Sequence, residues 1–197
     1  MKMSLSLSSA ALAAMCAASM PALAHEQVYA AALSGLNENP QNASLDGGAA
    51  VVTVDLDLFT MRVQTTFAGL SGNVTASHIH CCVTAPGNVG VASQTPTFIG
   101  FPVGGTFGSY DHTFDMTLAS SYNASFITNN GGTTSTAFSA LLAGLDAGRA
   151  YLNIHSSFAT GGEIRGFLTP VPEPETYALL LSGLAVVGWV ARRRKVA

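Results

Sequence analysis

The chain has 197 residues, of which 48% are apolar and 10% are charged, and its net charge at pH 7 is −3. This length allows one domain with appendages, and a charged fraction well below the usual ~25% predicts a surface covered by Thr, Ser, Asn and Gly. Between His25 and Pro170 there are three arginines, no lysine and nine acidic residues, a charge of −6 with histidine neutral. Because such a domain cannot neutralise phosphates, this balance excludes nucleic-acid binding.

The N-terminal segment has the pattern of an export signal. Met1 and Lys2 open it with a positive charge, and an apolar run follows as far as Ala24. Small residues at Ala22 and Ala24 suit a signal peptidase, so the sequence predicts a cleavable signal peptide over 1–24 and a mature N-terminus at His25. A retained anchor is the alternative, and the short apolar core favours removal.

Residues 25–170 have the pattern of an all-β domain. Apolar and polar residues alternate over 50–57, 59–67 and 111–118, which predicts strands, and glycine pairs separate the runs. Short turns without a βαβ rhythm predict an antiparallel β-sandwich or barrel. One helix is predicted over 135–147, where Phe138, Leu141 and Leu145 recur at helical spacing. Residues 81–110 are predicted to form a structured surface loop.

Histidines lie on two of the predicted strands. His78 and His80 point to the face opposite Ile79, and His155 shares the face of Tyr151 and Asn153. On a third strand Glu163 and Arg165 oppose Ile164. If these strands are neighbours, the ligand-capable residues converge, namely His78, His80, His155 and Glu163.

A His-x-His pair on a strand is a common way to hold copper or zinc. The layout resembles that of copper–zinc superoxide dismutase, an antiparallel sandwich with a His-x-His pair, although a counterpart of the bridged zinc site of that enzyme is missing. The alternative is a structural cluster in which Glu163 pairs with Arg165 or with His155.

Cys81 and Cys82 are the two cysteines that remain after signal-peptide removal. In an oxidising compartment this adjacent pair is predicted to close into a vicinal disulfide. One sulfur as a soft metal ligand, and pairing between molecules, are the alternatives. Hydrolase and phosphate-loop signatures are missing from the sequence, so we assign no catalytic residues and expect no enzyme.

Residues 171–197 are predicted to form a sorting or anchor segment. Pro172, Glu173 and Pro174 precede an apolar run over 177–191, and Arg192, Arg193 and Arg194 follow it. As a helix this run is roughly 22 Å long, short of the ~30 Å hydrocarbon core. We therefore expect an apolar C-terminal helix that holds the chain in the inner membrane transiently, with the arginines in the cytoplasm.

These three parts, in this order, closely resemble the PEP-CTERM sorting signal. The resemblance implies recognition by an exosortase-type membrane protease, removal of the tail, and delivery to the cell surface or the extracellular matrix.

The domain itself resembles the CHRD domain of chordin and of many bacterial secreted proteins. The resemblance rests on four separated motifs, which are Tyr29-x-Ala31-x-Leu33-Ser34-Gly35-x-Asn37-Glu38-x-Pro40, Ala76-Ser77-His78-Ile79-His80, Tyr151-Leu152-Asn153-Ile154-His155 and Gly162-Glu163-Ile164-Arg165-Gly166. It covers nearly all of 29–168 and implies an all-β fold without a known catalytic activity.

The expected function is that of an exported, surface- or matrix-associated binding or structural module without enzymatic activity. Extracellular polysaccharide, as in a biofilm matrix, is the expected surrounding. The alternative is a copper- or zinc-binding protein, with a redox role of the dismutase type, that uses His78, His80 and His155.

Overall fold

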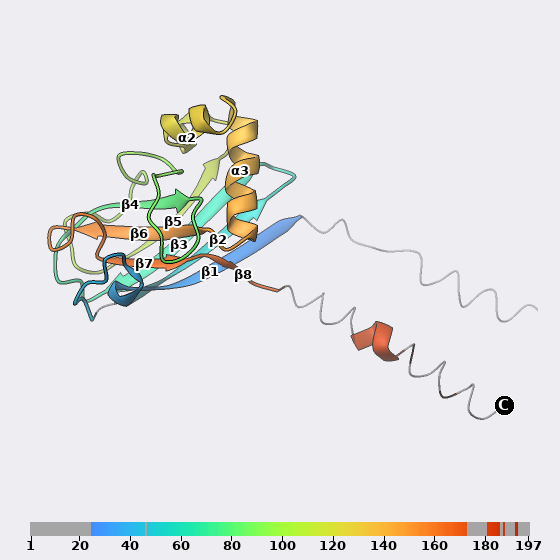
Figure 1. Ribbon diagram of the computed structural model, residues 1–197, viewed down its shortest axis with the longest axis horizontal. Coiled ribbons are helices and arrows are strands. Elements are labelled where there is room, and N and C mark those ends of the chain that lie inside the picture. The colour runs from blue at the N-terminus through green and yellow to red at the C-terminus, as the bar shows by residue number, and fades with distance from the viewer. Residues whose placement is uncertain (1–24, 46, 173–180, 186, 188–191, 193–197) are drawn as a thin grey trace, which may run out of the picture.

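The computed structural model describes residues 25–45, 47–172, 181–185, 187 and 192 (Figure 1). The predicted signal peptide 1–24 lies outside the described residues, as do Glu173, Pro174, Arg193 and Arg194. Pro172 and Arg192 are described and exposed. In the described parts of the chain we find no helix with the length and apolar character needed to cross a membrane. The predicted apolar C-terminal helix is described only over 181–185 and at 187, so it stays a prediction.

One eight-stranded antiparallel sheet forms the domain, in the order β4-β6-β7-β1-β2-β3-β5, with β8 paired to β1. The strands are β1 Glu26–Ser34, β2 Gly47–Asp55, β3 Thr60–Ala68, β4 Val74–Cys81, β5 Gly108–Asp115, β6 Ala150–Ser156, β7 Ile164–Phe167 and β8 Thr169–Pro170. The all-β antiparallel prediction is confirmed. The sheet is curled but open, because among the described strands the two at its edges, β4 and β5, do not pair and the connection 82–107 runs between them (Figure 1).

The predicted strands over 50–57 and 59–67 correspond to β2 and β3, while the third ends early. It was predicted over 111–118 and is observed as β5, Gly108–Asp115. The Asp115 carboxylate accepts hydrogen bonds from the backbone N–H and the hydroxyl of Thr117, at 2.9 and 2.6 Å. This local capping turns the chain away from the sheet, and alternation alone does not reveal it.

Helix α3, Thr134–Asp146, confirms the helix predicted over 135–147. It begins with a capping box between Thr133 and Thr136. Its buried residues Phe138, Leu141 and Leu145 pack into the same core as the apolar residues of the sheet. The shorter helices are η2 Gly35–Asn37, η3 Ala119–Ser121 and α2 Ala124–Asn129. They span too few residues for their periodicity to be read from the sequence.

The two faces of β4, β6 and β7 have different environments. Ile79 lies opposite Leu152, and Ile154 lies opposite Ile164, all within the apolar core. On the other face, polar and aromatic residues form two cross-strand rows, which are His78–Asn153–Arg165 and His80–Tyr151–Phe167. Loops cover these rows and bury most of their members. A polar layer is thus enclosed on the side of the sheet away from the core.

Candidate metal centre

The register of β4 and β6 brings three histidines together. His78 and His80 alternate with the core residue Ile79, so their rings share the polar face of β4. His155 lies on the same face of β6, opposite Ala76, whose small side chain leaves room for the imidazole. One ligand nitrogen from each ring lies within 4.8 Å of the others, and the ring centroids are 5.2 to 5.9 Å apart.

Each imidazole is oriented by a backbone carbonyl from a loop. His78 Nε2 lies 2.6 Å from Pro96 O, His80 Nδ1 lies 2.8 Å from Val89 O, and His155 Nδ1 lies 2.9 Å from Thr160 O. A carbonyl oxygen can only accept, so each of these nitrogens carries the proton and the opposite nitrogen of a neutral ring carries a lone pair. The opposite nitrogens are His78 Nδ1, His80 Nε2 and His155 Nε2, and all three are buried without a hydrogen-bond partner among the described residues.

The environment keeps these rings neutral. Burial lowers the pKa of His78, His80 and His155, and for His80 the pKa falls to about 4. The carbonyl hydrogen bonds oppose this shift but do not overcome the loss of solvent. Neutral imidazole is the form that binds a metal ion, because the coordinating nitrogen must offer its lone pair.

Glu163, predicted as a fourth ligand, is engaged elsewhere. Its carboxylate accepts hydrogen bonds from Ser44 Oγ at 2.8 Å, from the N–H groups of Ser71 and Gly72 at 2.6 and 3.3 Å, and from Ser156 Oγ. Burial raises the pKa of Glu163, but these hydrogen bonds outweigh it and hold the pKa below its usual value. Among the described residues, the group with ligand atoms within 4.8 Å contains the three histidines and not Glu163.

Strand geometry explains why Glu163 lies apart from the three histidines. Strand β7 begins at Ile164, one residue after Glu163, so the alternation used for the prediction does not extend to that carboxylate. Arg165 does lie on the polar face, but its ionic partner is Glu38, with 3.6 Å between Arg165 Nε and Glu38 Oε2. The predicted pairing of Glu163 with Arg165 or His155 is therefore replaced by four neutral donors.

A layered stack supports His80 from behind, and the sequence patterns did not predict it. The Tyr151 ring lies parallel to the His80 ring, with centroids 4.8 Å apart and an interplanar angle of 3°. The guanidinium of Arg165 lies 4.7 Å from the Tyr151 centroid. Arg165 also donates hydrogen bonds to the carbonyl oxygens of Asn37 and Pro86, at 2.5 and 2.7 Å. These contacts hold the loop that supplies the Val89 carbonyl to His80.

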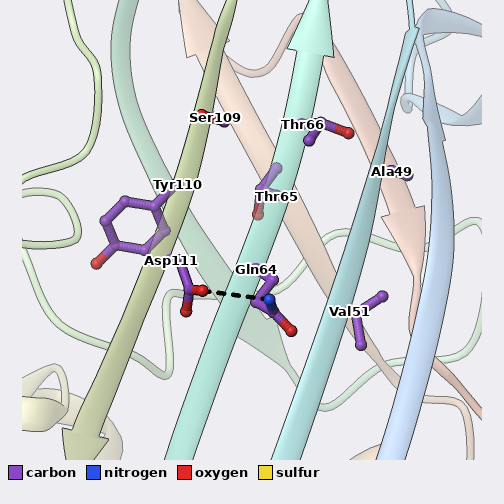
Figure 2. A pocket seen from close by; sticks show the side chains of 8 residues that line it. All are labelled: Ala49, Val51, Gln64, Thr65, Thr66, Ser109, Tyr110 and Asp111. Carbon is purple, nitrogen blue, oxygen red and sulfur yellow. Dashed lines mark hydrogen bonds between the residues drawn. The ribbon is translucent and has the colours of Figure 1, made fainter.

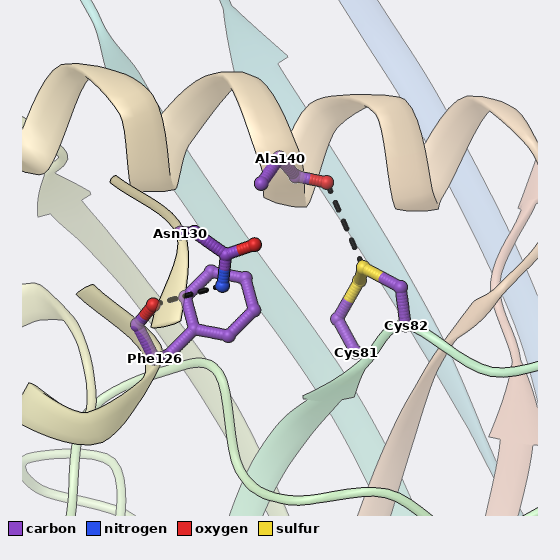
Figure 3. Close-up of a disulfide and its surroundings, with 5 residues drawn as sticks. All are labelled: Cys81, Cys82, Phe126, Asn130 and Ala140. Carbon is purple, nitrogen blue, oxygen red and sulfur yellow. Dashed lines mark hydrogen bonds between the residues drawn. A yellow bond between two sulfur atoms is a disulfide. The ribbon is translucent and has the colours of Figure 1, made fainter. Parts of the chain in front are cut away.

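Cys81 and Cys82 are joined by a disulfide at the end of β4 (Figure 3). Cys81 belongs to the apolar core, and Cys82 Sγ lies 3.6 Å from the carbonyl oxygen of Ala140 in α3. Gly144 of α3 packs so closely on both sulfurs that a Cβ there would overlap them. Neither sulfur belongs to the group of ligand atoms that the histidines form in the described part of the chain. The disulfide instead lies at the contact between the end of β4 and α3.

A shallow hollow of about 430 Å³ lies on β2, β3 and β5, away from the histidine strands β4 and β6 (Figure 2). Its acidic residue Asp111 accepts hydrogen bonds from Gln64 at 3.2 Å and from Arg62. The Arg62 guanidinium lowers the pKa of Asp111, which stays ionised and paired. The described residues of this hollow offer no comparable set of unpaired ligand atoms.

Two family matches cover most of the chain. The CHRD domain matches residues 29–168, and the PEP-CTERM protein-sorting motif matches residues 170–195. No curated protein and no solved structure matches the chain. The sorting motif implies an exported cell-surface protein that is processed by an exosortase-type enzyme. The chain belongs to the CHRD domain family and carries a C-terminal PEP-CTERM sorting motif.

Proposed function

We propose that this exported protein binds one copper or zinc ion through His78 Nδ1, His80 Nε2 and His155 Nε2. The observation that carries the proposal is the convergence of three buried nitrogens that have no hydrogen-bond partner within the described domain. Their opposite nitrogens are held by the loop carbonyls of Pro96, Val89 and Thr160. An imidazole that binds a metal commonly donates its other N–H in this way.

The energetic argument separates a metal site from a structural polar cluster. Leaving a buried polar atom unsatisfied costs about 1–3 kcal/mol, so three such atoms side by side are expensive. Arg165 and Glu163 show the opposite pattern, because each is surrounded by hydrogen-bond partners. An ion would satisfy all three histidine nitrogens at once. With metal–nitrogen bonds of ~2.0–2.1 Å, bound nitrogens are about 3.3–3.6 Å apart, so the rings need only a small inward movement.

We propose a binding role and not a catalytic one. The protonated nitrogens of the three rings donate to backbone carbonyls, so they are not available to move protons to or from a substrate. Sorting by the PEP-CTERM motif would then deliver the bound ion to the cell surface. Residence within extracellular polysaccharide is part of this proposal.

Metal analysis of the purified protein tests the proposal. Cells supplemented with copper and zinc should yield about one ion per chain, and His78→Ala or His80→Ala should remove it. His112→Ala is the matched control, because His112 is half-buried on β5, away from the three histidines. A substoichiometric metal content that His78→Ala leaves unchanged would reject the proposal.

A further inference from the structure

The charge of the candidate metal centre bears on which ion it prefers. Its three ligands are imidazoles, which bind as neutral groups, so the ligands do not offset the charge of the ion. The nearby buried carboxylates are occupied, Glu163 by four hydrogen-bond donors and Glu38 by Arg165. The net charge of the filled centre is therefore that of the ion itself.

The cationic group beside the centre is already paired, because Arg165 faces Glu38 at 3.6 Å. Arg165 lies 4.7 Å from the Tyr151 ring, which stacks at 4.8 Å on His80. Only the Tyr151 ring therefore stands between the guanidinium and the His80 imidazole. The cost of burying an ion rises with the square of its charge, so a dication costs about four times as much as a monocation of equal size.

The number and position of the ligands also favour a monovalent ion over a divalent one. Zinc(II) in proteins is almost always four-coordinate, whereas copper(I) is stable with three nitrogen ligands. Among the described residues, the group within 4.8 Å provides three ligands, and the sulfurs of Cys81 and Cys82 are not among them. The three coordinating nitrogens are buried, so an anion from solvent has no open position beside them in the described domain.

We infer that the three-histidine centre selects copper(I) over zinc(II) and copper(II). This inference rests on the proposed metal-binding function and adds the oxidation state of the ion. A site that prefers copper(I) stabilises the reduced form of the copper couple. The protein would accordingly carry copper outside the cell in its reduced form.

Competition titrations test the inference. The purified full-length protein is titrated with copper(I) under anaerobic conditions against bicinchoninate, and with zinc(II) against a chromophoric chelator. We expect one equivalent of copper(I) to bind about 100-fold more tightly than zinc(II), or two factors of ten in Kd. His25→Ala, which changes an exposed residue paired with Asp57, is the control and should leave both affinities unchanged.

Two variants separate charge from ligand count. Asn153→Asp adds a carboxyl group beside His78, its cross-strand neighbour, and keeps all three histidines. This variant should strengthen zinc(II) binding more than copper(I) binding, and so reduce the ratio of the copper(I) affinity to the zinc(II) affinity. His155→Asp, which replaces a neutral ligand by an anionic one, should shift the ratio in the same direction. If both variants fold and neither narrows the ratio, the charge argument is wrong.

The outcomes distinguish this inference from the proposed function. A copper(I) preference of less than tenfold, with one equivalent of zinc(II) lost in His78→Ala, overturns the inference and leaves the metal site intact. If neither ion binds stoichiometrically in a manner that depends on His78, both the inference and the proposed function fail.

Discussion

Replacing Arg165 with methionine tests how the polar layer supports the histidines. Arg165 is fully buried and donates hydrogen bonds to the carbonyl oxygens of Asn37 and Pro86 and to Asn88 Oδ1. It also faces Glu38 at 3.6 Å. Methionine retains an apolar stem against Tyr151 but removes all of these donors. Glu38 is then left in the interior without a counter-charge.

The expected loss follows from these contacts. Breaking a buried ion pair by removing one partner costs about 3–5 kcal/mol. Burial raises the pKa of Glu38 to about 7, so near neutral pH this carboxyl can take up a proton and avoid the full penalty. We therefore expect the lower end, about 3 kcal/mol at pH 7. For a domain of this size that corresponds to a fall in Tm of roughly 10 °C.

The pH dependence gives the sign of the effect. A raised pKa of Glu38 in the folded protein means that the fold favours the neutral carboxyl. The protein therefore loses stability as the pH rises from the pKa of the unfolded chain through the pKa of the folded protein. In Arg165→Met the pKa of Glu38 should rise further, because the guanidinium that lowers it is gone. The destabilisation should accordingly be larger at pH 8 than at pH 6.

Chemical denaturation of the parent, Arg165→Met, Glu38→Gln and the double variant measures these energies. The double variant should cost less than the sum of the single variants, since it leaves no unpaired charge. Metal affinity of Arg165→Met should fall about 10–100-fold, because the loop that holds Val89 against His80 loosens. A destabilisation below about 1 kcal/mol that does not vary with pH would refute this account of the layer.

Three further predictions concern α3, His80 and Glu163. Gly144→Ala should destabilise the protein by about 1–3 kcal/mol in urea unfolding, because the new Cβ overlaps both sulfurs of the disulfide. The control is Ser139→Ala on the exposed face of α3, which should be neutral or stabilising. Burial lowers the pKa of His80 to about 4. Below pH 6.5 the unfolded metal-free chain therefore binds more protons than the folded chain does. The parent should therefore lose part of its advantage in free energy of unfolding over His80→Gln, by at most about 3 kcal/mol, as the pH falls from 6.5 to 4. An increase in this advantage would contradict the prediction. Glu163→Gln should cost about 2 kcal/mol yet retain one ion per chain, and loss of the ion would restore Glu163 as a ligand.

Local patterns in the sequence were sufficient to predict the strand faces on which the histidines lie and the position of α3. Period-two alternation placed His78 and His80 on one face and His155 on the polar face of its own strand, because successive side chains of a strand point to opposite sides. Helical spacing located α3 to within one residue at either end. Alternation does not extend to Glu163, because β7 begins at Ile164 and a period of two does not show at which residue a strand begins.

Other features depend on contacts between distant residues. The order β4-β6-β7 decides that the histidine strands are neighbours, and among the described strands the missing β4–β5 pairing leaves the sheet open where a sandwich or barrel was expected. The Arg165–Glu38 pair joins the first connection of the domain to its seventh strand, and no local period links such distant positions. Pairings of this kind depend on how the whole chain packs.

The sequence by itself determined that an exported chain carries an antiparallel β domain with histidines on the faces of its strands. The tertiary structure decided that three of these histidines meet and that Glu163 does not join them. It also decided which nitrogen of each ring is left without a partner in the described domain. The physical reason is that loop carbonyls of Pro96, Val89 and Thr160 select the protonated nitrogen, and only the folded loops bring those carbonyls to the rings.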